Sequence, residues 1–207
     1  MLSRTDAKIV LNEIMNLYPD ARPTMRYENA FQLLMVVILS AQATDASIEK
    51  IQDKLFERYP SPEAVVESSI EEIETYINTI GLYHNKARYI FMSSQQLLDN
   101  FGGEVPTTRK ELTSLTGIGP KSANIILSVA YGEAAFAVDT HVTRICKHHN
   151  IVDDDATAQD IEKRVTEILP PEKWGHAHQA MINFGREICK PRSPLCNNYP
   201  QLYAHLD

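Results

Sequence analysis

The stretch Leu115-Thr116-Gly117-Ile118-Gly119-Pro120-Lys121-Ser122-Ala123 decides the fold of this chain of 207 residues. It lies between two segments with helical spacing, and Thr108-Arg109-Lys110-Glu111 before it fits a capping box, which marks the start of a helix. Gly117 and Gly119 allow unusual φ angles and a close approach to the bare backbone, and Pro120 suits the first turn of a helix because it has no N–H. The pattern therefore predicts helix, tight turn and helix over residues 108–132.

A turn of this kind directs amide N–H groups outward at the N-terminus of a helix. That arrangement is suited to an anion such as a DNA phosphate, which it would hold without reading any base. Taken alone, Gly-x-Gly is more often a plain turn between helices. The choice between the two interpretations depends on what else the chain brings to the turn.

Lys121 and Asp139 form a candidate catalytic pair. A helix from Lys121 to Tyr131 rises about 16 Å, and the extended residues 134–139 return about 20 Å, so Asp139 can come back beside Lys121. A lysine and a carboxylate next to a phosphate-binding turn are a catalytic constellation. Against this, most single lysines are solvated surface groups, and Asp139-Thr140 can be a simple helix cap.

Helical spacing dominates the rest of the chain, which contains no convincing run of alternating apolar and polar residues. The sequence therefore predicts an all-α protein of about ten helices with short connections. The expected helices include residues 5–17, a central apolar helix capped by Asn29, a helix opened by Ser61-Pro62, one from Ser69 to a C′ residue at Gly81, residues 83–98, and one from Thr157 to Leu169. The run Leu33–Leu39 is apolar on all sides and predicts the buried centre.

The composition limits the possible partners. The formal net charge of −7 counts against nucleic acid, but residues 107–150 carry five basic and three acidic side chains, +5 − 3 = +2, which leaves −9 for the remainder. The longest apolar run has seven residues, far short of the ~18 that a membrane helix needs. The N-terminus lacks the features of a signal peptide, so a cytoplasmic protein with reduced thiols is expected.

The hairpin, followed by Val138-Asp139-Thr140-His141-Val142-Thr143-Arg144, resembles endonuclease III-like DNA glycosylases of the helix-hairpin-helix superfamily. Three further blocks in the same order are similar to that family's motifs: Leu39-Ser40-Ala41-Gln42-Ala43-Thr44-Asp45, Ile80-Gly81-Leu82-Tyr83-His84-Asn85-Lys86-Ala87 and Gly103-Glu104-Val105-Pro106. The resemblance covers nearly the whole chain. It implies two helical subdomains with a cleft for DNA between them: residues 23–133, a six-helix barrel with the hairpin, and residues 1–22 plus 134–207.

The resemblance also implies a reaction. The lysine that matches Lys121 attacks C1′ of a damaged nucleotide, the base departs, and a Schiff base leads to strand cleavage by β-elimination. Asp139 stabilises the positive charge on the sugar and moves protons. Because a stacked base is out of reach, the nucleotide must be flipped; Gln42 then fills the gap and Leu82 wedges between bases. The hairpin residues implied to contact DNA are Thr116, Gly117, Ile118, Gly119 and Ser122.

The C-terminal end departs from the family pattern. Members typically hold an iron–sulfur cluster with four cysteines spaced C-x6-C-x2-C-x5-C, because thiolates are the ligands that such clusters require. Cys189 and Cys196 occupy the first two places, but Tyr199 and His205 occupy the third and fourth. We therefore expect no cluster, no metal and two leftover thiols. A zinc site formed by Cys189, Cys196 and His205 is a minor alternative.

The resemblance implies a base-excision repair enzyme, which we expect to work as a monomer on duplex DNA with damaged or abasic nucleotides. Oxidised pyrimidines are the expected substrate class, and the expected location is the cytoplasm, at the nucleoid in a bacterium. Adenine-removing members of the superfamily typically lack this lysine. Two alternatives stay open: an 8-oxoguanine glycosylase/lyase, and a hairpin module that binds DNA without catalysis.

Overall fold

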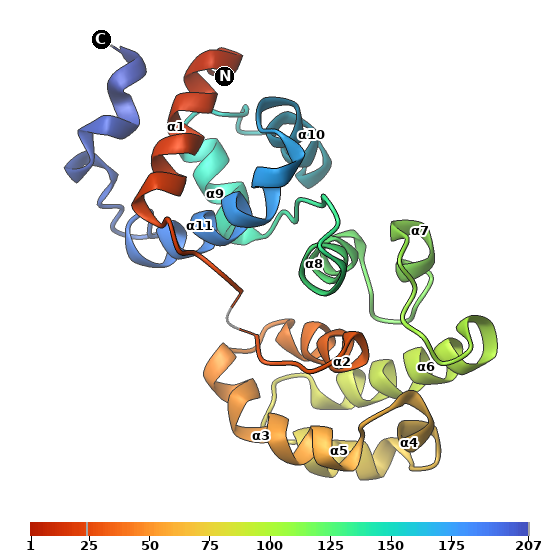
Figure 1. Cartoon of the computed structure of the whole chain (residues 1–207). Coiled ribbons are helices and arrows are strands. Elements are labelled where there is room, and N and C mark those ends of the chain that lie inside the picture. Colours follow the sequence, from red (N-terminus) through yellow and green to blue (C-terminus); the bar gives the residue numbers. More distant parts are fainter. Residues whose placement is uncertain (24, 207) are drawn as a thin grey trace. The chain divides into compact units, whose positions relative to one another are not determined.

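The chain folds into two compact units of helices. The computed structural model describes the backbone of residues 1–23 and 25–206 and the side chains of residues 1–23 and 25–203. Within that part of the chain every regular element is a helix, so the all-α prediction is confirmed. Figure 1 shows the helices of both units, which we name the hairpin unit (Thr24–Glu133) and the terminal unit (Met1–Pro23 and Ala134–Asp207).

The hairpin unit is built around one apolar helix. Its elements are α2 (Ala30–Ser40), α3 (Asp45–Arg58), α4 (Pro62–Val66), α5 (Ile70–Ile77), α6 (Tyr83–Phe101), α7 (Arg109–Leu112) and α8 (Pro120–Tyr131). Every residue of α2 from Phe31 to Leu39 is buried, because α3, α6 and α8 all pack against this helix. The predicted buried centre is therefore confirmed, and it supports the helix that carries Lys121.

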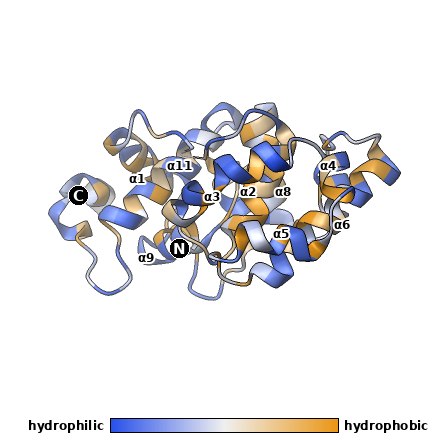
Figure 2. Cartoon of the chain, turned by 90° about the horizontal axis from the view of Figure 1, so that it is seen from below, coloured by the Kyte–Doolittle hydropathy of each residue, from blue (hydrophilic) through white to orange (hydrophobic). Residues whose placement is uncertain are grey.

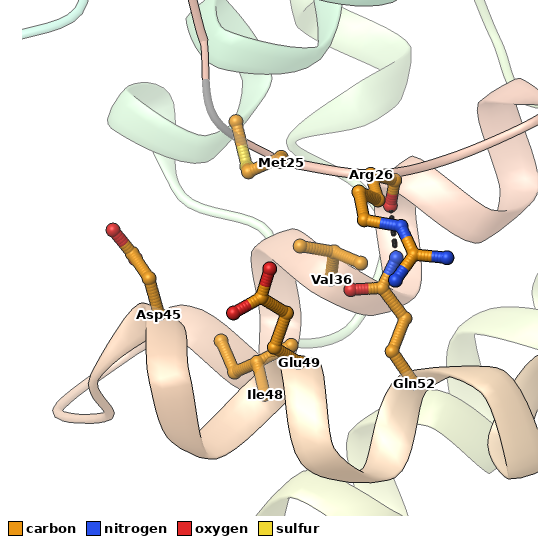
Figure 3. A pocket seen from close by; sticks show the side chains of 7 residues that line it. All are labelled: Met25, Arg26, Val36, Asp45, Ile48, Glu49 and Gln52. Atoms are coloured by element: carbon orange, nitrogen blue, oxygen red, sulfur yellow. Dashed lines mark hydrogen bonds between the residues drawn. The ribbon is translucent and has the colours of Figure 1, made fainter.

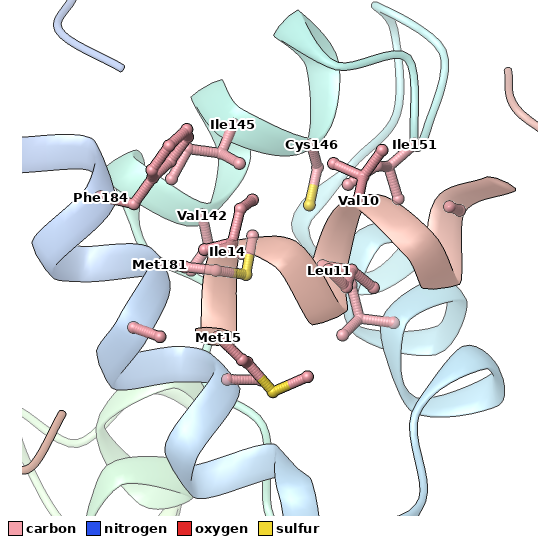
Figure 4. Close-up of a cluster of buried hydrophobic side chains, with 14 of the residues drawn as sticks. Val10, Leu11, Ile14, Met15, Val142, Ile145, Cys146, Ile151, Met181 and Phe184 are labelled. Carbon is pink, nitrogen blue, oxygen red and sulfur yellow. The ribbon is translucent and has the colours of Figure 1, made fainter. Parts of the chain in front are cut away.

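The terminal unit joins the two ends of the chain around its own core. Its elements are α1 (Arg4–Leu17), α9 (Thr140–His148), α10 (Ala158–Ile168), η1 (Pro171–Lys173), α11 (Trp174–Glu187), η2 (Cys196–Asn198) and η3 (Pro200–Leu206). Figure 4 shows apolar side chains of α1, α9 and α11 meeting in this core, among them Ile14, Val142 and Phe184. The core places α9, which Asp139 begins, against α11.

Local sequence sets most helix starts. The Asn29 side chain accepts a hydrogen bond from the Gln32 N–H at 2.9 Å, and Ser69 accepts one from the Glu72 N–H at 3.1 Å. Thr157 forms a complete capping box with Asp160. These predicted caps are confirmed, although Ser61, at the N-cap of α4, makes no side-chain capping bond.

Gly81 does not end the helix that Ser69 begins, so its predicted role as the C′ residue is wrong. The helix opened by Ser69 ends at Ile77, with Asn78 as its C-cap in a right-handed conformation, so Gly81 is not its C′ residue. The Ile80 N–H bonds to the Ile77 carbonyl at 2.9 Å in a turn that follows the helix. The apolar spacing of Ile80 continues past the helix because the side chain is buried all the same, at 2% exposure.

Most helices carry one apolar and one polar side, as the orange and blue ribbons of Figure 2 show. This is the pattern of helices that cover a core and face water with the other side. Among the described residues, no helix is long and apolar enough to cross a membrane.

Candidate active site and Cys/His group

The helix-turn-helix predicted for residues 108–132 is formed by α7, a turn and α8. Thr108 caps α7, and Gly119 is the N-cap of α8, with Pro120 at its first position. The hydrogen-bond ladder of α8 begins with the bond from the Ala123 N–H to the Gly119 carbonyl, at 2.9 Å. The N–H groups of Lys121 and Ser122 lie before this bond, where a helix offers no carbonyl partner. Because Gly119 has no side chain to cap these amides, the start of α8 is suited to an anion.

The amides of the turn do not all face outward. The Thr116 N–H bonds to Oε1 of Gln96 at 2.7 Å, and the Ile118 N–H bonds to the Leu115 carbonyl at 3.1 Å. The Ile118 side chain is buried, so it anchors the turn in the core. Two of the residues predicted to bind DNA therefore use their amides inside the protein.

The two glycines of the turn serve different purposes, which a pair of substitutions tests. Gly117 has φ +86°, and a Cβ there would lie 2.9 Å from the Tyr89 side chain, whereas a Cβ on Gly119 would meet nothing within 4 Å. We expect Gly117→Ala to lower the free energy of unfolding by about 1–3 kcal/mol. Gly119→Ala should unfold like the wild type but bind duplex DNA more weakly, because its methyl group stands where a phosphate would approach. Urea unfolding and DNA titration of both variants measure this; equal stability of the two would contradict it.

Lys121 lies in the first turn of α8 with an exposed side chain. Lys86, in the motif block at the start of α6, contrasts with it: its side chain is 2% exposed, and its Nζ has no hydrogen-bond partner among the described residues. Burial lowers the pKa of Lys86. Of these two lysines, only Lys121 is accessible to a macromolecular substrate.

Asp139 belongs to the terminal unit and is the N-cap of α9. Its Oδ1 accepts a hydrogen bond from the Val142 N–H at 2.8 Å, so the helix start fixes the carboxylate. Lys121 and Asp139 thus lie in different units, and each is positioned by the first turn of a helix. Their approach to each other stays a prediction from the length of the chain between them.

Close packing of α9 on α11 holds the Asp139 helix in place. Arg144 donates hydrogen bonds to the carbonyls of Gly185 and Cys189, each at 2.8 Å. A Cβ on Gly185 would lie 2.7 Å from Nδ1 of His141, so this close approach requires glycine. Burial lowers the pKa of His141; Asp139 opposes that change, and Arg144 adds to it.

Gln42 and Leu82 share an unusual backbone and a common location in the hairpin unit. Their φ angles are +53° and +61°, in the left-handed region that residues other than glycine rarely adopt. Their loops meet at Gly81, where a Cβ would lie at an ordinary contact distance of 3.5 Å from the Gln42 carbonyl oxygen. Both side chains are exposed, Leu82 to 52%. Strain of this kind gathers at binding sites, and here it presents an amide and an apolar side chain to solvent.

A pocket of about 210 Å³ lies in the hairpin unit, between α3 and the segment that precedes α2 (Figure 3). Its charged lining residues are Arg26, Asp45 and Glu49. Arg26 pairs with Asp53 at 3.1 Å, and its carbonyl accepts a hydrogen bond from Gln52. With its one cation already paired and two carboxylates present, the pocket is unsuited to a phosphate.

Four potential metal ligands meet in the terminal unit. They are His148, His149, Cys189 and Cys196, which we call the Cys/His group; their ligand atoms all lie within 4.8 Å of one another. Burial raises the pKa of the Cys196 thiol to about 12, and the Cys189 thiol adds to this rise. The family motif points to the two cysteines, whereas nothing in the sequence pattern singles out the two histidines as ligands. The side chain of His205, the alternative ligand predicted from the sequence, lies outside the described residues.

The composition of the group argues against an iron–sulfur cluster, the cofactor that the complete family motif would hold. A four-iron cluster takes four cysteine thiolates, each on a different iron, and so needs ligands spread around a cube. The Cys/His group has two thiols, and its four ligand atoms are close enough to surround a single ion. The group can therefore bind a metal, but it does not fit a four-iron cluster.

The chain is similar in sequence and in fold to known DNA repair proteins. The model of the HhH-GPD superfamily of base excision DNA repair proteins matches residues 35–171. Endonuclease III of Bacillus subtilis (strain 168) is 39% identical over 98% of this chain and 92% of its own length, and that of Escherichia coli (strain K12) is 36% identical over 91% and 89%. A solved trapped covalent intermediate of an endonuclease III with DNA superposes with a TM-score of 0.94 at 42% identity, covering 98% of this chain and 95% of that one. The chain therefore belongs to the HhH-GPD superfamily of base excision DNA repair proteins and, within it, to the endonuclease III family.

Proposed function

We propose that this DNA glycosylase and abasic-site lyase removes oxidised pyrimidines from duplex DNA, with Lys121 as nucleophile and Asp139 as its carboxylate partner. The observation that carries the proposal is the exposed amine of Lys121 in the first turn of α8, directly after the glycine turn. A phosphate held by the amides at the start of this helix would place a sugar beside that amine. A trapped covalent intermediate with DNA is known for a relative that is 42% identical.

In the proposed reaction the Lys121 amine attacks C1′ and forms a C–N bond while the bond from C1′ to the base breaks. The base leaves with the bonding electrons and takes up a proton. Opening of the sugar ring gives a protonated imine, loss of a C2′ proton breaks the bond to the 3′ phosphate, and water then releases the lysine. This sequence needs a nucleophilic amine and proton transfers, which side chains of this chain supply without a cofactor.

Asp139 has the opposite task to Lys121. Its Oδ1 is fixed by the Val142 N–H, so the carboxylate has a set orientation at the start of α9. A fixed negative charge stabilises the positive charge that develops on the sugar as the base departs. Arg144, which bonds to two carbonyls of the α11 region, keeps the helix that carries this charge in position.

Gln42 and Leu82 are suited to entering the duplex. An exposed apolar side chain held in a strained backbone can separate stacked bases, and a neighbouring amide can bond to the base left unpaired. Holding Leu82 at φ +61° costs about 1–2 kcal/mol, and backbone strain of this size is typical of binding and catalytic sites.

Two substitutions at Leu82 separate strain from function. Both Leu82→Ala and Leu82→Gly remove the wedge, but only glycine relieves the left-handed strain. We expect both variants to release damaged bases from paired duplex at least about tenfold more slowly. The free energy of unfolding of the glycine variant should be about 1 kcal/mol higher than that of the alanine variant. Wild-type rates of base release in both would contradict the assignment.

The substrate class is tested on a panel of duplexes. Wild-type protein should release the base from an oxidised pyrimidine, cleave an abasic duplex and form a borohydride-trapped adduct with both, while it acts poorly on 8-oxoguanine. Faster release of 8-oxoguanine would replace this proposal with the 8-oxoguanine alternative. Binding of the abasic duplex without cleavage or trapping would indicate a non-catalytic hairpin module.

We infer that the enzyme has no four-iron cluster, because the Cys/His group has only two thiols. We also place the enzyme at the DNA of the cell interior, the nucleoid in a bacterium, since its substrate is there.

A further inference from the structure

We propose that the Cys/His group binds one zinc ion in a structural site. The group combines two cysteine sulfurs with two histidine nitrogens, all within 4.8 Å of one another. Zinc prefers four such ligands in a tetrahedron; with Zn–S near 2.3 Å and Zn–N near 2.0 Å, neighbouring ligand atoms lie roughly 3.5 Å apart. Small side-chain movements therefore close the group around one ion.

The backbone holds both halves of the site before any ion binds. His148 ends α9, and the His149 N–H bonds to the Ile145 carbonyl at 3.0 Å, so the helix terminus fixes the two histidines. The Cys189 N–H bonds to the Phe184 carbonyl at 2.8 Å, and the Leu195 N–H bonds to the Ile188 carbonyl at 2.9 Å. The second of these bonds closes the loop between the two cysteines, so both thiols point from fixed positions.

The surroundings of the group are those of a structural site. Cys189, Cys196 and His149 are buried, and His148 alone is exposed. The ring of His149 lies against Phe184, with ring centroids 5.8 Å apart, and against Tyr203 at 6.0 Å. The Cys189 carbonyl accepts a hydrogen bond from Arg144, and this bond fixes the backbone of the Cys189 ligand. Four protein ligands leave no open position, so the ion stabilises the fold and does not take part in the reaction.

The site connects two segments that are remote in sequence. Its histidines end the helix that Asp139 begins, while Cys189 follows α11 and Cys196 begins η2. An ion bound there fixes α9 against the loop between the two cysteines, which is the part of the fold where the cluster cysteines of the family motif occur. The zinc ion thus anchors this loop in place of an iron–sulfur cluster, with two cysteines and two histidines as ligands.

Metal analysis of the purified full-length chain tests the inference without any activity assay. We expect about one zinc per chain and no stoichiometric iron. After removal of zinc, Co²⁺ should bind with the intense visible bands of tetrahedral coordination and a thiolate charge-transfer band. Stoichiometric iron with acid-labile sulfide, an octahedral cobalt spectrum, or a protein that neither retains zinc nor binds Co²⁺ would overturn the proposal.

Matched variants locate the site. Cys189→Ser and Cys196→Ser should each lose zinc and the charge-transfer band, while Cys146→Ser, a buried thiol of the same core outside the group, should keep both. Because serine in a core can impair folding, His148→Ala provides a second test at an exposed position. It should fold like the wild type by circular dichroism and bind zinc at least about tenfold more weakly. His84→Ala, an exposed histidine of the hairpin unit, should leave zinc affinity unchanged, and undiminished zinc in the cysteine variants would overturn the assignment.

Discussion

Replacing Lys121 by glutamine is expected to abolish borohydride trapping of the enzyme on damaged or abasic DNA. Glutamine is similar in length but has no nucleophilic amine, so no imine forms for borohydride to reduce. Strand cleavage at an abasic site should fall by about 10³-fold or more, the scale on which loss of a covalent nucleophile acts. Because the Lys121 side chain is exposed, the free energy of unfolding should change by no more than about 0.5 kcal/mol.

The control for this experiment is Lys110→Gln. Lys110 is an exposed lysine of α7 in the same hairpin unit, so its removal changes the local charge equally but leaves the proposed nucleophile intact. Trapping should persist in this variant. Trapping at the wild-type level in Lys121→Gln would contradict the assignment of Lys121 as the nucleophile.

Replacing Asp139 by asparagine should separate the catalytic role of this residue from its role as a helix cap. Asparagine caps helices as well as aspartate does, so α9 should keep its start and the protein its stability within about 0.5 kcal/mol. The negative charge is lost, however, and base release should slow by roughly 10²–10³-fold. Single-turnover base release and urea unfolding measure the two effects.

Asp139→Ala completes the comparison. This substitution removes both the negative charge and the hydrogen bond from the Val142 N–H. Its free energy of unfolding should fall by about 1 kcal/mol, and its rate of base release should fall by as much as that of the asparagine variant. If asparagine restored wild-type activity and alanine did not, Asp139 would be a helix cap and no more.

Much of this fold could be predicted because its signals are local. Asn29, Ser69 and Thr157 mark helix starts through bonds to amides three residues away, and the glycine turn lies between two helices as its residue types indicate. Gly81 was misinterpreted because a glycine after an apolar stripe is typical of a helix end, whereas here the helix stops earlier and the glycine packs against the loop of Gln42.

The candidate site was only partly accessible to the same reasoning. The roles of Lys121, Asp139, Gln42 and Leu82 came from resemblance, and no sequence pattern indicates the left-handed backbone of Gln42 and Leu82, which their loops impose. The Cys/His group was missed for a different reason. Its histidines lie about forty residues before its cysteines, and only the packing of α9 on α11 brings them together.

The two thiols that replace a set of four have a consequence for the conditions under which the enzyme works. Oxidised bases arise when cells are exposed to oxidants, and the same oxidants degrade iron–sulfur clusters. Zinc has no redox chemistry, so a zinc ion in the Cys/His group would bring no redox-active metal to this part of the fold. An enzyme anchored by zinc in this way would need neither iron nor sulfide to complete its fold.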